Sequence, residues 1–343
     1  MDLTKDNITE LIKKIAIPAS VGTFFQTMYN LVDSKFAGLI SPEALTAIVK
    51  SFPIYLIIIA ASVGISAGTT ALISNTLGQK DTEKASVLFA QSIIVALLIT
   101  FVVTFIGIAS IKDILIILKS NNQIISYATD YMNVIFSGSI VIFLLVTINA
   151  SLVSRGDTKS YRNVLIFSFF LNILLNPLFI YGFYLIPAMG ISGIALATIV
   201  SELIGLIYLI YKINKTEIRE YLSPECFKPK IALISDILKQ AVPSGLSMGM
   251  VGFGVFILIY LVSSYGDFSA GGYGTGVRFE QLFLLPILGL NTATLSLVGQ
   301  NFGAYNLNRI KEIYILTLKY GIGLMIIGGL IIFISSPFIM RFF

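Results

Sequence analysis

Long apolar segments constrain the fold of this chain more than any short motif does. Nine runs of about twenty or more mostly apolar residues follow one another along the 343-residue sequence, at residues 15–40, 52–77, 87–108, 124–153, 164–186, 191–211, 237–262, 272–298 and 313–338. A helix needs roughly 20 apolar residues to cross the ~30 Å hydrocarbon core of a bilayer. The runs therefore predict an all-α polytopic membrane protein, in keeping with a composition that is 56% hydrophobic and 12% charged.

The distribution of positive charge predicts the orientation in the membrane. Of the 23 Lys and Arg residues, sixteen fall on the side of the spans that holds the N-terminus and four on the other side. Because cytoplasmic loops carry the excess of Lys and Arg, we expect a multi-pass cell-membrane protein with a cytoplasmic N-terminus. The net charge of +5 then reflects membrane topology, and we expect no nucleic-acid partner.

The residue types present exclude several chemistries. The chain has no histidine, which removes histidine-based metal sites and histidine acid–base catalysis. Its single cysteine, Cys226, cannot form an internal disulfide, and no phosphate-binding Walker motif occurs. We therefore expect a protein that is not an enzyme, needs no cofactor and does not use ATP.

The sequence also contains an internal repeat. A shift of 225 residues pairs Pro18 with Pro243, Gly64 with Gly289, Gly78 with Gly303, and Lys84 with Arg309. Six spans precede the polar segment 212–236, so both copies begin on the same side of the membrane, as parallel repeats do. We predict a six-helix lobe at residues 1–211, a cytoplasmic linker at 212–236 and a partial, three-helix lobe at 237–343. The shorter second copy fits either a fragment or a truncated protein.

Several stretches resemble the MATE family, the multidrug and toxic compound extrusion transporters. "NLVDSKFAGLISPEALTAI" and "GTTALISNTLGQKDTEKA" are similar to its first two spans, "NASLVSRGDTK" and "LNILLNPLFIYGF" to spans four to six, and "GVRFEQLFLLPILGLNTATLSLVGQNFGA" to span eight. The similarity covers nearly the whole chain and ends about three of twelve spans short. The resemblance implies two helical lobes in a V around a central cavity. It also implies a monomer that exports amphipathic, often cationic small molecules in exchange for Na⁺ or H⁺.

One acid stands out within the first span. Asp33 lies in an apolar segment, where a carboxylate costs at least ~2.5 kcal/mol unless it faces a cavity or a partner. Its spacing from Gln26 and Asn30, with Tyr29 adjacent, predicts one polar helix face directed into the lobe. The alternative is that Asp33 lies solvated at the outer interface, paired with Lys35.

The family resemblance implies a cation or proton site around this acid. Its matching positions here are Asp33, Asn172 and Asn176 on the fifth span, and Thr198 on the sixth, all of which offer the oxygen ligands that hard cations prefer. Many relatives have Asp where this chain has Asn176. Na⁺ should then bind more weakly, and protonation of Asp33 becomes a possible coupling step. The asparagines could instead serve helix–helix hydrogen bonding.

We expect the substrate cavity to be lined by Gln26, Tyr29, Asn30, Asn149 and Glu202. Glu202, one turn after Thr198, could bind a cationic compound or could pair structurally. Pro18 removes a backbone hydrogen bond from the first span, and the resemblance implies that this helix bends there during transport. The alternative is an inert packing kink.

Three functions fit these observations. The first is an antiporter of the MATE type. The second is a lipid-linked sugar flippase of the same broader superfamily, whose cavity would be rich in Arg and Lys for phosphate. The third is a non-transporting fragment. The acids in the first lobe favour a cationic cargo, and the last two remain as alternatives.

Overall fold

The computed structural model describes residues 1–118, 120–263 and 267–342 of the chain. Apart from two 3₁₀ turns and one isolated bridge, its regular structure is α-helical. The helices are α1 (Ile8–Ile40), α2 (Pro42–Gly78), α3 (Thr82–Ile117), α4 (Asn122–Ser137), α5 (Ser139–Val153), α6 (Lys159–Tyr181), α7 (Ile191–Ile213), α8 (Ile231–Ser263), α9 (Asp267–Gly303) and α10 (Leu307–Phe342). Each predicted apolar run corresponds to one of these helices or, in one case, to a pair of them.

Polar residues in the connections define where the first helices begin. The side chains of Asn7, Ser41, Asp81 and Asn121 each accept a hydrogen bond from a backbone N–H in the first turn of α1, α2, α3 and α4. Such caps satisfy N–H groups that have no partner within the helix. Pro42 follows the Ser41 cap at the start of α2, where a missing N–H costs nothing.

Two predicted spans need correction. The run at 124–153 is two helices, α4 and α5, which are bent by 47° across Gly138. A side chain at Gly138 would overlap Ile199 of α7, so the bend lies where two helices approach closely. The run at 164–186 ends earlier, at Tyr181, because Gly182 has φ 76° and the chain leaves the helix there.

The described helices suit a bilayer. By length and apolar composition six of them can cross a membrane, or seven if the bent α4–α5 pair forms one span. Helix α1 is not among the six, and its internal polar residues, such as Gln26, Asn30 and Asp33, account for that. The chain is thus an all-α polytopic membrane protein.

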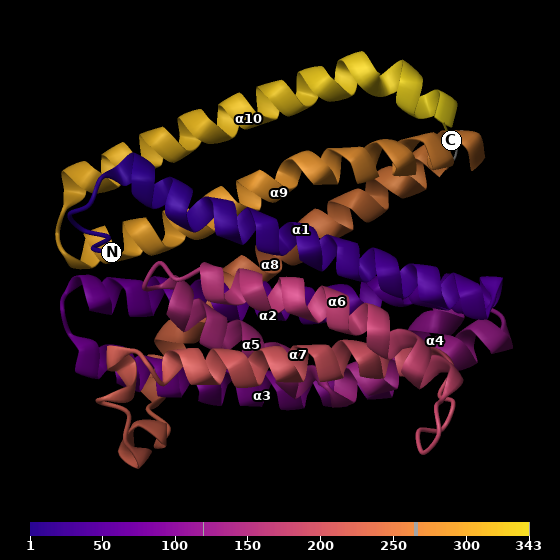
Figure 1. Cartoon of the computed structure of the whole chain (residues 1–343), viewed down its shortest axis with the longest axis horizontal. Helices are drawn as coiled ribbons and strands as arrows, with labels where there is room; N and C mark the ends of the chain where they lie inside the picture. The colour runs from indigo at the N-terminus through magenta and orange to yellow at the C-terminus, as the bar shows by residue number, and fades with distance from the viewer. Residues whose placement is uncertain (119, 264–266, 343) are drawn as a thin grey trace.

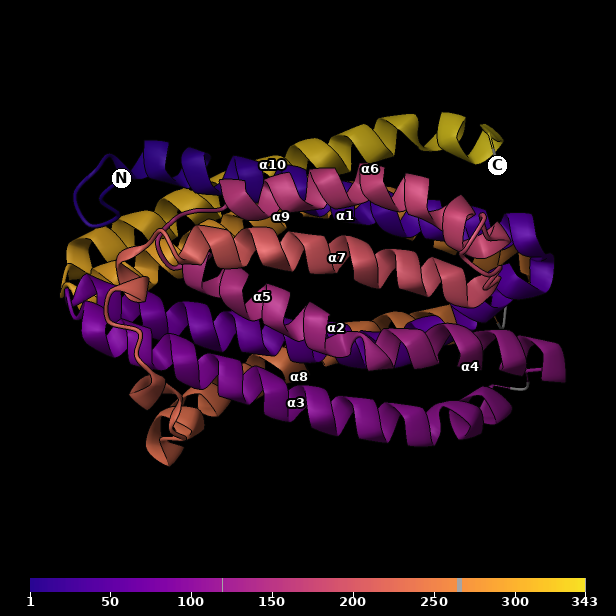
Figure 2. The ribbon, with the colours of Figure 1, turned by 60° about the horizontal axis from the view of Figure 1, so that its bottom comes forward.

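Helices α1 to α7 form one bundle. Figures 1 and 2 show α6 and α7 side by side on one face, with α4 and α5 packed against α7 and with α2 and α3 on the far side of α4 and α5. Its interior is apolar at both ends, with Ile58, Phe136 and Phe143 in one cluster and Phe89 and Leu209 in another. Asp33 and the polar side chains that bond to it, described below, lie between α1, α6 and α7.

The helix bounds repeat with the predicted 225-residue shift. Helices α2 and α9 have 37 residues each, α3 and α10 have 36 each, and α1 and α8 have 33 each. Both ends of α2 and α3 fall 225 residues before those of α9 and α10. The division into two lobes stays a prediction, but the helices of the two copies match in length and order.

Close glycine contacts join the two copies reciprocally. A side chain at Gly78 of α2 would overlap the Gln300 carbonyl of α9, and one at Gly303 would overlap the Asn75 carbonyl of α2. Each contact becomes the other under the same shift. Gly64 against Ala241 and Gly289 against Ala16 form a second reciprocal set. The copies therefore pack about an approximate two-fold axis, through contacts that only glycine permits.

These contacts gather toward the end of the molecule that holds the N-terminus, which we call the N-terminal end. There Leu11 and Ile15 of α1 pack with Leu290 and Leu297 of α9. Figure 1 shows α9 and α10 close to α1 at this end and diverging from it toward the opposite end. The helices thus form a V that is closed at the N-terminal end.

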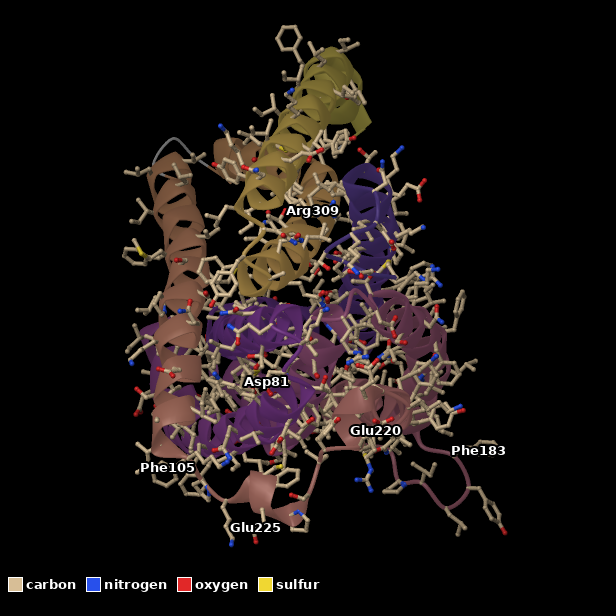
Figure 3. All side chains as sticks on the ribbon, turned by 90° about the vertical axis from the view of Figure 1, so that its left-hand side faces the viewer. Asp81, Phe105, Phe183, Glu220, Glu225 and Arg309 are labelled. Atoms are coloured by element: carbon tan, nitrogen blue, oxygen red, sulfur yellow. The ribbon has the colours of Figure 1, made fainter. Side chains whose placement is uncertain are left out.

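The first residues of the chain cross this closed end. The Asn301 side-chain amide donates to the Leu3 carbonyl at 3.0 Å, and the Arg309 guanidinium donates to the Asp6 carbonyl at 2.8 Å. Figure 3 shows Arg309 between α1 and the start of α10. The Asp2 carboxylate accepts hydrogen bonds from the Thr4 backbone N–H and hydroxyl, which fix this turn and hold the pKa of Asp2 below its ordinary value of 3.8.

Candidate functional site

Asp33 lies inside the bundle where α1, α6 and α7 meet. Its side chain is 5% exposed. The amide nitrogen of Asn176 on α6 donates to Oδ1 at 3.0 Å, and the hydroxyl of Thr198 on α7 donates to Oδ2 at 2.9 Å. Both partners are neutral. The alternative in which Asp33 is solvated or paired with Lys35 is wrong, because Asp33 is buried and forms no ion pair within the described part of the chain.

The predicted partners on α6 extend the cluster. Asn172 and Asn176 are fully buried, and Asn176 Nδ2 also donates to Asn172 Oδ1 at 2.8 Å. One amide nitrogen therefore lies between oxygens of Asp33 and Asn172. Within the described residues, Asn176 Oδ1 and Asn172 Nδ2 have no hydrogen-bond partner. The structure brings together all four residues of the predicted cation set, while their role in binding stays a prediction.

The geometry of this cluster suits a small cation after one local rotation. A 180° turn of the Asn176 amide would place its oxygen, rather than its nitrogen, beside Asp33 and Asn172. Oxygens from Asp33, Asn172, Asn176 and Thr198 would then converge, which is a ligand set for Na⁺ or a similar hard ion. With a cation bound there, the amide oxygen that now lacks a partner would gain the ion, while the amide nitrogen would give up its two present acceptors.

The predicted polar face of α1 is wrong in one respect. Tyr29 and Asp33 are buried and point into the bundle, whereas Gln26 and Asn30 are exposed. All four residues lie on the same side of α1. Helices α6 and α7 cover only part of that side, so two of the residues are buried and two are exposed. Sequence spacing identifies the polar side of the helix, but which of its residues are buried depends on the neighbouring helices.

Glu202 and Asn149 are also within the bundle. Glu202 lies on α7 one turn after Thr198, the residue whose hydroxyl donates to Asp33. Glu202 Oε2, Asn149 Oδ1 and the Tyr29 hydroxyl are buried and have no hydrogen-bond partner within the described residues. Buried polar atoms are almost always paired with protein, water or ligand, so this interior favours water or a polar guest.

Sequence reasoning missed further polar atoms of this kind. Ser62, Thr69, Thr129, Asn133 and Ser201 each have a buried oxygen that lacks a partner within the described residues. The available signal was a polar residue within an apolar run. Serine and threonine usually bond to their own helix backbone, so they carry less information than Asp33 does.

Pro18 lies within α1, which continues through it as a single helix. Three residues earlier, the Ile15 carbonyl accepts a hydrogen bond from the Thr158 hydroxyl at 2.9 Å, which ties α1 to the connection between α5 and α6. A proline at this point leaves the helix locally short of one backbone bond. Bending at Pro18 during transport stays a prediction.

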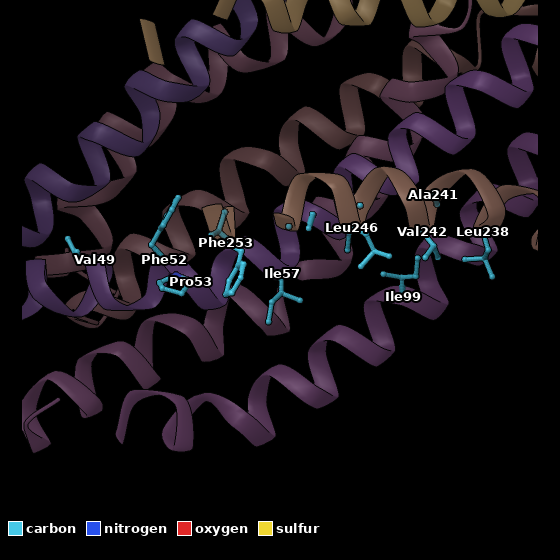
Figure 4. Close-up of a pocket in the computed structure, with 15 residues that line it drawn as sticks. Val49, Phe52, Pro53, Ile57, Ile99, Leu238, Ala241, Val242, Leu246 and Phe253 are labelled. Carbon is cyan, nitrogen blue, oxygen red and sulfur yellow. The ribbon is translucent and has the colours of Figure 1, made fainter. Parts of the chain in front are cut away.

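A large apolar cavity lies apart from the Asp33 cluster. Its volume is about 770 Å³, and Figure 4 shows it between α2 and α8 with Ile99 of α3 at one side. Pro53, Ile57, Val242 and Phe253 are among its walls, and none of the predicted site residues lines it. Apolar residues in a membrane span give no signal that would single out such a cavity.

Comparison with known proteins agrees with this architecture. The MatE family model matches residues 18–178 and 243–343. The probable multidrug resistance protein NorM of Thermotoga maritima is 28% identical over 99% of this chain and 74% of its own length. The multidrug export protein MepA of Staphylococcus aureus (NCTC 8325) is 25% identical over 90% of this chain and 68% of its own length. An FAD transporter of Shewanella oneidensis is 26% identical over 91% of this chain and 69% of its own length.

Solved structures give the same result. Crystal structures of a MATE protein in its straight and bent conformations each align with a TM-score of 0.89 at 26% identity. The alignment with the straight conformation covers 99% of this chain and 76% of the solved chain. The alignment with the bent conformation covers 98% of this chain and 75% of the solved chain. The family model matches well over half of the sequence, and the all-helical fold matches that of solved MATE structures. This chain therefore belongs to the MATE family of membrane transporters.

Proposed function

We propose that this protein is a secondary active multidrug efflux antiporter, which exports amphipathic, cationic compounds in exchange for Na⁺ or H⁺. The observation that carries the proposal is the buried carboxylate of Asp33, whose hydrogen-bond donors are the neutral side chains of Asn176 and Thr198. A carboxylate at this depth without a counter-charge is costly. It is therefore suited to bind a proton, a metal cation or a cationic group in turn.

Antiport follows from the competition for this one charge. When Asp33 is ionised, the bundle interior attracts a cation. When a proton or Na⁺ neutralises it, that attraction disappears and a cationic cargo is released. The cargo and the coupling ion must neutralise Asp33 at different stages of the transport cycle. The ion gradient then determines the direction in which the cargo moves.

The residues around Asp33 support a cationic rather than an anionic cargo. Glu202 adds a second acid to the same interior, and its Oε2 has no hydrogen-bond partner within the described residues. Tyr29, also unpaired at its hydroxyl, offers an aromatic ring to a cationic group. An anionic dinucleotide such as FAD, the cargo named for one relative, would be repelled by Asp33 and Glu202.

Conformational coupling is supported by the relatives and by two features of α1. MATE structures in straight and bent conformations resemble this chain equally well overall. In this chain, α1 carries both Asp33 and Pro18. Neutralisation of Asp33 would weaken its bonds to α6 and α7, and the proline provides a weak point at which α1 could respond.

The test is transport by the purified chain in sealed vesicles. A fluorescent cationic dye is loaded, and either a Na⁺ gradient or a pH gradient is imposed, with each compared to no gradient. Gradient-driven dye movement in wild type and its loss in Asp33→Asn would support the proposal. Dye movement that ignores both gradients would contradict antiport.

The same vesicles discriminate the two alternatives. A flippase would move a labelled lipid-linked sugar between leaflets and would not respond to Asp33→Asn, since an acid at that position does not recognise phosphate. A non-transporting fragment would move neither dye nor lipid. Either result would replace the antiporter as the explanation.

A further inference from the structure

A second cavity lies on the outer surface of the bundle, between α6 and α7, toward the N-terminal end. Its volume is about 410 Å³, and its lining consists of Asn163, Val164, Phe167, Ile204, Gly205 and Tyr208. We call it the α6–α7 groove. Phe167 is 53% exposed and Ile204 is 39% exposed, so its walls face the surroundings of the bundle, which in a membrane protein are lipid chains.

One glycine accounts for the shape of the groove. Gly205 lies in the middle of α7, and a side chain there would overlap Val164 of α6. The two helices therefore approach closely at this level. The apolar hollow lies beside this contact, with Phe167 of α6 and Ile204 of α7 among its walls.

Two of the six lining residues each hold a positively charged side chain at the rim. The Arg162 guanidinium donates to Asn163 Oδ1 through Nε at 3.1 Å and through Nη2 at 2.8 Å. The Lys212 ammonium lies 5.5 Å from the centre of the Tyr208 ring. Both lie in the end turns of their helices, Arg162 in the first turn of α6 and Lys212 in the last turn of α7. The positive end of the α6 dipole adds to the field of Arg162, whereas Lys212 lies at the negative end of the α7 dipole, which stabilises its charge.

No carboxylate neutralises these two cations in the described part of the structure. Neither takes part in an ion pair there. The nearest acids along the chain are otherwise engaged or buried. Asp157 accepts two hydrogen bonds from Ser160, Glu217 pairs with Arg155, and Glu202 Oε2 is buried inside the bundle.

We propose that the α6–α7 groove binds one anionic phospholipid of the leaflet at the N-terminal end. One acyl chain fills the apolar hollow, and the phosphate lies between the Arg162 guanidinium and the Lys212 ammonium. The bilayer supplies acyl chains to any apolar hollow on the lipid-facing surface. The two free cations select the headgroup, because basic clefts between spans at the cytoplasmic surface favour anionic lipids over zwitterionic ones.

The expected preference can be given as a ratio. A basic residue close to an anionic headgroup favours binding by about five-fold, so two residues give a preference of roughly 25-fold for phosphatidylglycerol over phosphatidylcholine. The lipid would contact α6 and α7, the helices that carry Asn176 and Thr198. The inference stands on the groove alone and does not depend on the proposed cargo or coupling ion.

The test measures retained lipid on the whole purified 343-residue chain. The protein is titrated in detergent with palmitoyl-oleoyl phosphatidylglycerol or phosphatidylcholine, and bound lipids are counted by native mass spectrometry. We expect wild type to retain one phosphatidylglycerol molecule preferentially. The double variant Arg162→Gln, Lys212→Gln should lose most of the 25-fold preference. The control Lys84→Gln, Lys311→Gln removes two exposed cations from the same end and should keep it.

A third variant separates groove binding from surface attraction. Ile204→Trp fills the hollow and leaves both rim cations in place, so it should reduce retention of phosphatidylglycerol. Unchanged retention in Ile204→Trp would show that no chain occupies the groove. Equal loss in the rim and control double variants would show that only overall charge matters. Either outcome overturns the proposal.

Discussion

Asn176 Nδ2 and Asp33 Oδ1 lie 3.0 Å apart, and this hydrogen bond links α6 to α1 in the interior of the bundle. The same nitrogen contacts Asn172 Oδ1 at 2.8 Å. A neutral donor therefore lies where a cation would be coordinated. This arrangement makes Asp33 the one group in the cluster of Asp33, Asn172, Asn176 and Thr198 whose formal charge can change during a transport cycle.

Asp33→Asn should leave the protein folded in the membrane and abolish gradient-driven efflux. The substitution removes a buried charge that costs free energy, and the new amide can still bond to Asn176 and Thr198. The remaining ligands are neutral and cannot exchange one cation for another. Efflux is measured in vesicles at matched expression, with Asp130→Asn, an exposed acid on α4, as the control. Undiminished efflux by Asp33→Asn would remove this residue from the mechanism.

Asn176→Asp should change the site in the opposite direction. It places a second carboxylate next to Asp33, which strengthens Na⁺ binding or, where no Na⁺ enters, retains a proton between the two acids. Binding of ²²Na⁺ to purified protein measures the first outcome directly. Asn163→Asp, on the outer side of the same helix, adds an equal charge away from Asp33. Asn163→Asp should bind no more ²²Na⁺ than wild type. If Asn176→Asp also binds no more ²²Na⁺ than wild type, and takes up no additional proton, Asn176 is not a ligand position.

Much of this arrangement can be predicted from sequence, because membrane burial makes polar residues conspicuous. Asp33 interrupts an apolar run, whereas Asn172, Asn176 and Thr198 are the partners that the resemblance to the MATE family implies, and the structure brings the four together. The matching order and lengths of the helices in the two copies agree with the 225-residue shift that paired Pro18 with Pro243 and Gly78 with Gly303. These features are local in sequence, so they appear before any tertiary contact is known.

Other features depend on packing and could not be predicted. The bend at Gly138 lies inside a continuous apolar run, where hydropathy does not distinguish a straight helix from a broken one. The exposure of Gln26 and Asn30 depends on where α6 and α7 cover α1. The α6–α7 groove requires Gly205 to meet Val164, a contact between helices that no spacing rule provides.

Glu202→Gln should weaken the efflux of cationic dyes about ten-fold and leave a neutral substrate unaffected. A charge-assisted contact contributes roughly 1.5–3 kcal/mol, and about 1.4 kcal/mol corresponds to a factor of ten. The two substrates are compared in the same vesicle preparation, so that differences in protein amount cancel. Equal loss for both substrates would assign Glu202 a structural role instead.

Gly78→Ala and Gly303→Ala should each lower the thermal stability of the purified protein. An added methyl group at either position overlaps a backbone carbonyl of the other copy, and such overpacking typically costs about 1–3 kcal/mol. Gly323→Ala is the matched control, because nothing lies within 4 Å of a side chain there. It should be neutral or slightly stabilising, since it lowers the backbone entropy of the unfolded chain. Similar melting temperatures for all three variants would contradict the reciprocal packing.

Loss of the Arg309 and Asn301 contacts should free the first residues of the chain at the N-terminal end of the V. Leu3 is 2% exposed, and its carbonyl is fixed by Asn301, which in turn accepts from Arg309 at 3.1 Å. In a background where Cys226 is replaced by Ser, a cysteine introduced by Leu3→Cys reports on this end through its rate of reaction with a water-soluble maleimide. The rate should be low in that background and should rise several-fold when Arg309→Gln or Asn301→Ala is added, because residues 1–7 lose their attachment to α9 and α10. Lys311→Gln removes a neighbouring exposed charge without touching these contacts and should leave the rate unchanged. A cysteine that reacts equally fast in all of these proteins would mean that Asn301 and Arg309 do not hold residues 1–7 against α9 and α10.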